Sequence, residues 1–192
     1  GAKIPDTFQG TVFLGEGIEE EPAYHLAFRE RADERLDCVR VIRDKRYAYH
    51  KNYMPYAPAG QHLAYLWKAE ATRAWEQHHR EGKTDAITGR FFEPRVSEEF
   101  FDNEKDFDNV HNLIEADEHQ ERIAELKNVL RQRQLELYDS GLLPEQMRVR
   151  RAKENGLMIY DMVRDEKLYP LATYLDAADL ALARDKSNLD TF

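Results

Sequence analysis

Three short stretches in the first third of the chain predict β-strands. Residues 23–28 include aromatic side chains, residues 38–42 are rich in β-branched side chains, and residues 47–51 alternate tyrosines with other groups. A polar turn at 43–46 separates the last two, so we expect the three strands to form an antiparallel meander. A fourth strand is expected at 98–101, before an acidic turn.

A loop and a helix are expected after the third strand. Residues 54–60 contain Pro55 and Pro58, and each proline fixes φ and removes a backbone donor, so the strand pattern ends there. Residues 61–80 then place apolar side chains at intervals of three and four, which predicts an amphipathic helix. Gly82 is a suitable position for this helix to end.

A second long helix is predicted to begin at 117–120, with Asp117 as its cap and Gln120 reaching back. It should continue to about Asp139 and stop at Gly141. Its buried stripe consists of Ile123, Leu126, Leu130 and Leu137. The sheet face expected to receive the helix carries Val39, Val41, Tyr47 and Tyr49.

The last fifty residues predict short helices. Pro144 suits a first helical turn, and the pattern breaks at Gly156 and Pro170. One helical face carries Leu171, Leu175, Ala178 and Leu182. Residues 187–190 resemble the cap of another helix, as at the start of a helical repeat array, although no second copy occurs at a fixed period.

These elements define an α+β chain with a four-stranded antiparallel sheet, a packed long helix and a helical extension. We predict a lead-in at 1–21, an α+β unit at 22–143 and the extension at 144–192. With 192 residues and 42% hydrophobic content, the chain is long enough for one packed domain or a small domain with appendages.

Charge and composition narrow the classes of partner. The net charge of −9 is spread along the chain and argues against a nucleic-acid partner, which would require a basic face. No apolar run approaches the ~20 residues that span a bilayer, so no membrane partner is expected. Residues 1–10 lack the pattern of a signal peptide, and one cysteine cannot form an internal disulfide, so the compartment is undetermined.

No complete catalytic or metal site is evident in the sequence. Cys38 lies in a strand pattern and is interpreted as a buried cysteine. His62, His78 and His79 lack the spacing of a metal-binding pair and are interpreted as surface residues. Residues 102–108 lack the central glycine and the terminal glutamate of a calcium loop, so they are expected to form a turn.

Several segments in a consistent order resemble the C-terminal subdomain of the type I, formylglycine-dependent sulfatases, members of the alkaline phosphatase superfamily. The similarity is strongest with the bacterial and heparan-N-sulfatase-like branch, and it covers roughly residues 4 to 145. The segments are IPDTFQG at 4–10, RERADER at 29–35, VIRDKRY at 41–47, EEFFD at 98–102 and NVHNL at 109–113. Phe107 and Asp108 depart from the family pattern, which has an aspartate-proline pair here.

The resemblance implies that this chain is the tail of a longer enzyme that hydrolyses sulfate esters or N-sulfates. The formylglycine nucleophile and the calcium ion would then lie in a catalytic domain that precedes it, so the chain alone would be inactive. Cys38 lacks the family's motif, in which proline or alanine and then serine-arginine follow the cysteine. The partners implied are that catalytic domain and a sulfated small molecule or glycan.

The resemblance also implies loops that close one side of the substrate pocket. The best candidates for substrate contacts are His50, Asn52, Tyr56, Gln61 and His62, because an aromatic ring can stack on a sugar while polar groups bond its hydroxyls. The alternative is that Tyr53, Met54 and Tyr56 only cover the edge of the sheet. Two other functions stay open at this point: the tail of a phosphonate or phosphate monoester hydrolase of the same superfamily, and a stand-alone interaction module.

Overall fold

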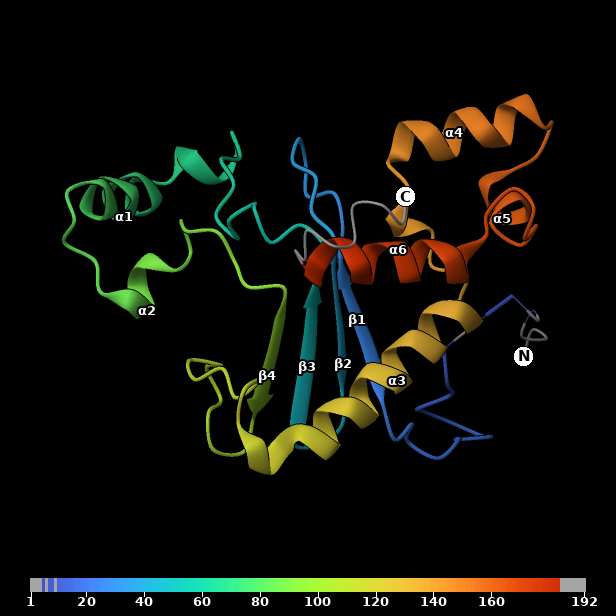
Figure 1. Cartoon of the computed structure of the whole chain (residues 1–192), viewed down its shortest axis with the longest axis horizontal. Coiled ribbons are helices and arrows are strands. Elements are labelled where there is room, and N and C mark those ends of the chain that lie inside the picture. The colour runs from blue at the N-terminus through green and yellow to red at the C-terminus, as the bar shows by residue number, and fades with distance from the viewer. Residues whose placement is uncertain (1–4, 6, 9, 184–192) are drawn as a thin grey trace.

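The computed structural model of the chain describes residues 5, 7, 8 and 10–183. One antiparallel sheet lies at its centre, with the strands in the order β1-β2-β3-β4 (Figure 1). The strands are β1 His25–Arg29, β2 Val39–Arg43, β3 Tyr47–Asn52 and β4 Glu98–Asp102. This confirms the predicted α+β class with a four-stranded antiparallel sheet.

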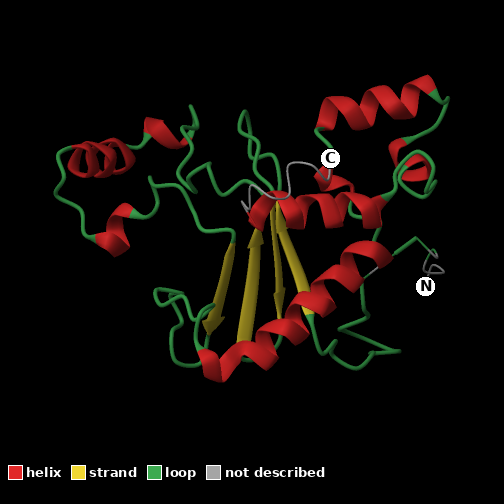
Figure 2. Ribbon diagram, in the orientation of Figure 1, coloured by secondary structure: helices red, strands yellow, loops and turns green. Residues whose placement is uncertain are grey.

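The helices form two groups: those between β3 and β4 lie to one side of the sheet, and those after β4 lie across it and on its other side (Figure 2). The connection between β3 and β4 carries η1 Leu66–Lys68, α1 Glu70–Arg80 and α2 Ala86–Gly89. The chain after β4 forms η2 Asp117–His119, α3 Gln120–Glu136, η3 Ser140–Leu142, α4 Glu145–Glu154, α5 Ile159–Met162 and α6 Leu171–Ala183. No described helix is both long enough and apolar enough to cross a membrane.

Helix α3 crosses one face of the sheet and forms the main core with it (Figure 1). Ile123, Leu126 and Leu130 of the helix are almost completely buried, as predicted from their spacing. Their buried partners on the sheet are Ile42, Tyr49 and Phe100. Alternation on the strands and helical spacing on α3 therefore meet in one apolar interior.

The predicted sheet face was wrong for Val39 and Val41. Tyr49 lies opposite Ile42 in the ladder, whereas Val41 lies opposite His50. Directly opposed residues share a face, so Ile42 joins Tyr49 beneath α3, and Val39 and Val41 point to the other side. The hairpin register decides this, and alternation within each strand does not reveal it.

The first long helix begins later than predicted. Residues 61–65 are not helical, and α1 starts only at Glu70, after the short turn η1. Long-range hydrogen bonds hold the earlier residues: Gln61 Nε2 donates to the Leu36 carbonyl, and the Ala64 N–H donates to Glu34. The predicted stop is confirmed, because Gly82 follows the C-cap with φ of 69°.

Both ends of α3 differ from the prediction. Asp117 does not cap the helix, because it lies within η2, and Gln120 donates its side-chain amide to the carbonyls of Ile114 and Ala116. The helix ends at Glu136, ahead of Tyr138, which adopts a left-handed φ of 53°. The buried stripe continues after Leu130 with Gln134, whereas Leu137 was predicted to be its next member.

The helical extension has its own apolar cluster. The breaks predicted at Gly156 and Pro170 are confirmed, since each lies between two helices. Leu171 and Leu175 are buried, whereas Ala178 and Leu182 on the same stripe are half-buried. The cluster also contains Leu143, Ala152, Met162, Val163 and Tyr169. The predicted cap at 187–190 lies outside the described residues.

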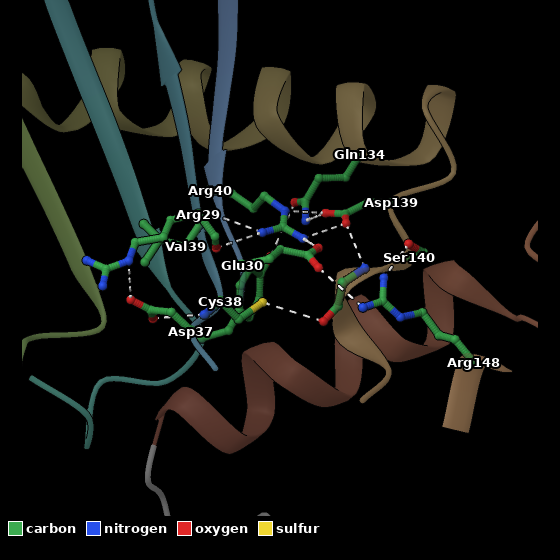
Figure 3. A network of polar contacts seen from close by, with 12 residues as sticks. Arg29, Glu30, Asp37, Cys38, Val39, Arg40, Gln134, Asp139, Ser140 and Arg148 are labelled. Atoms are coloured by element: carbon green, nitrogen blue, oxygen red, sulfur yellow. Dashed lines mark hydrogen bonds and ion pairs between the residues drawn. The ribbon is translucent and has the colours of Figure 1, made fainter. Parts of the chain in front are cut away.

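A buried polar network joins this extension to the sheet (Figure 3). The Arg40 side chain is only 3% exposed, and its guanidinium donates to both carboxylate oxygens of Asp139, each at 2.7 Å. The same guanidinium bonds Glu30 at 2.7 Å, and Glu30 also pairs with Arg148. A Cβ at Gly141 would overlap the ends of the Arg40 and Glu30 side chains, so any other residue there would displace this ion pair.

Candidate functional site

The loop after β3 is held by a second segment, residues 91–97, that runs beside it. The Asn52 N–H donates to the Ser97 carbonyl, the Arg95 N–H to the Pro55 carbonyl at 2.7 Å, and the Gly60 N–H to the Phe91 carbonyl at 2.7 Å. A Cβ at Gly60 would overlap the ring of Phe91, which explains the glycine there. These bonds fix a loop whose prolines cannot donate.

A cleft of about 410 Å³ lies between the end of this loop and α1. Gln61 and His62 line it from the loop, Arg35 from the turn after β1, and His79 and Arg80 from α1. Its remaining walls are Pro58, Gly60, Glu76 and Phe92. Two guanidinium groups and two imidazoles thus lie together at the end of the loop that was predicted to contact substrate.

The acidic residue of the cleft is already engaged. Glu76 accepts a 2.8 Å hydrogen bond from the Trp67 indole and a 2.7 Å bond from Arg80. The Trp67 hydrogen bond, followed by the Arg80 charge, holds the pKa of Glu76 below its ordinary value, so this residue stays ionised. The negative charge of Glu76 therefore balances the positive charge of Arg80 within the cleft.

Arg35 differs from Arg80. Its Nε donates to the His62 carbonyl at 2.6 Å, which orients the side chain across the cleft. Within the described part of the chain, no carboxylate forms an ion pair with Arg35. Its positive charge is consequently the one in the cleft best placed to meet an anionic group.

The five residues predicted from the sequence do not form one site. Gln61 and His62 share the cleft. Tyr56 is 68% exposed and lines a separate cavity of about 480 Å³ between the loop and the helical extension. The roles of the five residues as substrate contacts stay predictions.

His50 and Asn52 lie away from both hollows, because their strand positions turn them elsewhere. His50 packs edge-on against Phe101, and burial lowers its pKa despite the nearby charge of Glu99. Asn52 is 1% exposed, and its amide donates to the Val96 carbonyl at 2.7 Å and to Glu99 at 3.0 Å. His50 therefore packs against β4, and Asn52 is hydrogen-bonded to β4 and to the segment before it.

Sequence reasoning missed Arg35 and Arg80 as members of the cleft. They come from a turn and a helix that are distant in sequence from the loop, and no local spacing links them. Arg35 belongs to the arginine-rich run at 29–35, where no spacing distinguishes it from Arg29 or Arg31, so the sequence carried no signal for it.

Cys38 does not fit a nucleophile. It is 7% exposed, and its Sγ lies 3.7 Å from the Gly141 carbonyl. Burial raises the pKa of the thiol to about 11, which keeps it protonated at neutral pH. Among the residues the structure describes, no group of three or more His, Cys, Asp or Glu side chains is placed to hold a metal ion.

Comparison with known proteins relates the chain to the sulfatases. No family model matches the sequence. A curated relative, the ulvan-active sulfatase of Formosa agariphila, is 30% identical over 146 residues. The match covers 76% of this chain but only 24% of the relative, so the chain spans about a quarter of that protein's length.

Proposed function

We propose that this chain is the substrate-facing C-terminal part of a longer sulfate-ester hydrolase of the formylglycine-dependent type. The 30% identity over 146 residues to a sulfatase supports the class of reaction. In this proposal the nucleophile and the calcium ion belong to another part of the polypeptide. This chain supplies walls of the substrate pocket and a rigid support for them.

The observation that carries the proposal is the cationic cleft at the end of the loop. In a chain of net charge −9, Arg35 projects into a hollow without a carboxylate partner among the described residues. A guanidinium presents a planar array of donors that suits an anionic oxygen group such as a sulfate or carboxylate. His62 and Gln61 add neutral hydrogen-bonding groups beside it.

We infer that the ligand of the cleft is a sulfated carbohydrate. The relative is named for its activity on ulvan, and an aromatic and polar cleft with one available guanidinium suits a polar, charged sugar. Phe92 offers an apolar wall, and Gln61 and His62 can bond hydroxyl groups. Such contacts act on parts of the substrate that do not react.

Contacts of this kind are equally strong in the ground state and the transition state, so they lower KM and leave the chemical step unchanged. In the longer polypeptide, Arg35→Gln and His62→Ala should each raise KM for oligosaccharides prepared from ulvan by about tenfold. Turnover of 4-nitrophenyl sulfate, which lacks the sugar groups that this proposal assigns to the cleft, should change little.

Arg43→Gln is the matched control, because Arg43 is an exposed arginine at the opposite end of the sheet. The isolated 192-residue chain should not hydrolyse 4-nitrophenyl sulfate above a buffer blank. Equal losses on both substrates would place Arg35 and His62 in the reaction itself. No loss on either substrate would remove the cleft from substrate binding.

A further inference from the structure

We propose that Asp37, Arg95 and Arg29 form a positioning unit that sets the conformation of the loop at residues 54–59. This inference rests on the proposed function, because it assigns these three residues a role in substrate preference through the loop. None of them lines the cationic cleft. They are therefore positioning residues and not substrate contacts.

Asp37 is the centre of the unit. Its side chain is 1% exposed, which is rare for a carboxylate and requires compensating partners. Oδ1 accepts from Arg95 Nη2 at 2.6 Å and from the Cys38 N–H at 2.8 Å. Oδ2 lies 3.2 Å from Arg29 Nε. One buried carboxylate is thus hydrogen-bonded to Arg95, from the segment before β4, and forms an ion pair without a hydrogen bond with Arg29, from β1.

Arg95 transmits this fixed position to the loop. Its side chain is 12% exposed, Nε donates to the Ala57 carbonyl at 2.9 Å, and Nη2 also reaches the Met54 carbonyl at 3.2 Å. Its backbone N–H donates to the Pro55 carbonyl at 2.7 Å. Arg95 alone therefore binds three of the four backbone carbonyls of residues 54–57.

Arg29 holds the far end of the same loop. Its Nη2 donates to the Ala59 carbonyl at 3.2 Å, while its Nε pairs with Asp37. The carbonyls of Met54, Pro55, Ala57 and Ala59 all accept from these two arginines. Because Pro55 and Pro58 lack an N–H, the loop is held largely through its carbonyl groups.

The chemistry requires arginine at position 95. A guanidinium can donate in several fixed directions at once, whereas a lysine ammonium on a flexible stem cannot match carboxylate and carbonyls together. Gly60, Gln61 and His62 follow the loop directly in sequence, so the position of the loop also sets where these three residues lie. A loop released from Arg95 would let His62 leave the cleft.

Hydrogen exchange on the 192-residue chain tests the unit without any substrate. In Arg95→Gln, the amides of Ala57 and Gly60 should exchange roughly tenfold faster or more, because charge-assisted bonds to their loop are lost. The amides of Leu126 and Leu130 in α3 should keep their rates. Arg90→Gln is the control, since Arg90 directly precedes that segment but donates to the Asn109 carbonyl instead.

Two results would overturn the proposal. Unchanged rates at Ala57 and Gly60 would show that the loop does not depend on Arg95. Equal acceleration in α3 would show that Arg95 supports the whole fold and has no special role at the loop. Arg95→Lys serves as a second variant, and it should show the same local pattern with the fold intact.

Kinetics in the longer polypeptide separate this inference from the proposed function. Arg95→Gln should raise KM for the same oligosaccharides by about tenfold and leave turnover of 4-nitrophenyl sulfate within about twofold. If Arg35→Gln and His62→Ala raise KM but Arg95→Gln does not, the positioning role is wrong and the proposed function stands. If none of the three changes KM, the proposed function fails, and hydrogen exchange alone decides whether the unit positions the loop.

Discussion

The two interfaces of the sheet are stabilised by different forces. Beneath α3 the contact is apolar, with Ile42, Leu126 and Leu130 each no more than 1% exposed. At the junction with the helical extension the contact is charged, and Arg40 binds Asp139 and Glu30. Gln134 marks the change, because this buried α3 residue donates to Asp139, whereas Leu130, the buried residue one turn earlier, is apolar.

The apolar contact and the charged contact fix the position of their helices to different degrees. Hydrophobic burial is not directional, so the α3 contact tolerates small shifts as long as its area is kept. The Arg40 fork fits Asp139 in one geometry, and this geometry places η3 and α4 on the sheet. A buried ion pair of this kind is a strong constraint on position and is costly to leave half-formed.

The largest expected loss of stability comes from breaking the charged junction. Arg40→Ala should lower the free energy of unfolding by about 3–5 kcal/mol, because the largely buried carboxylate of Asp139 would lose its charged partner and Glu30 would keep only Arg148. Chemical denaturation measures this. The exposed pair of Arg131 and Asp176 provides the control, since Arg131→Ala should cost only ~0.2–1 kcal/mol. Similar losses for both variants would remove the distinction between the two kinds of pair.

The apolar interface should respond next. Leu126→Ala should cost ~2–5 kcal/mol, because the site is fully buried beneath the sheet and leaves a cavity. Val41→Ala should cost clearly less, since Val41 is half-buried on the opposite face. Unfolding midpoints of the two variants test this order, and a larger loss at Val41 would contradict the assignment of faces.

The smallest effect concerns acid stability. Burial alone would raise the pKa of Asp139, but the hydrogen bonds and charge of Arg40, together with Gln134 and the Gly141 N–H, lower it below its ordinary value. A depressed carboxyl pKa contributes stability above the unfolded value of about 3.9, and this contribution is lost as the pH falls through the folded pKa.

Unfolding of the wild type and of Asp139→Asn at several pH values checks this effect. The two proteins should differ most near neutral pH, and the difference should narrow below about pH 4. A difference that stays constant down to acid pH would show that the charge of Asp139 is not what stabilises the junction.

Part of the fold could be predicted because it depends on local spacing. The strands around Val41 and Tyr49 and the stripe of Leu126 follow from periodicity along a few neighbouring residues. The face was predicted correctly for Tyr47 and Tyr49 and wrongly for Val39 and Val41, although the connection of four residues between Arg43 and Ala48 determines it. Asp44 closes that connection by accepting from the Arg46 and Tyr47 N–H groups.

The candidate site was predicted only where it is local. The prolines and polar groups of residues 52–62 indicated an ordered loop with hydrogen-bonding side chains, and Gln61 and His62 do line the cleft. Asn52 had the right chemistry, but its amide is used by Val96 and Glu99. Side-chain type alone cannot reveal whether a donor is already satisfied.

The class of fold, the positions of the strands and the apolar stripe of α3 could be predicted, because each depends on residues a few positions apart. The buried face of each strand, and the meeting of Arg35 and Arg80 beside His62, became evident from the three-dimensional arrangement. The same arrangement places Asp37 between Arg29 and Arg95. Such contacts depend on chain reversals that bring distant segments together, and no local period records them.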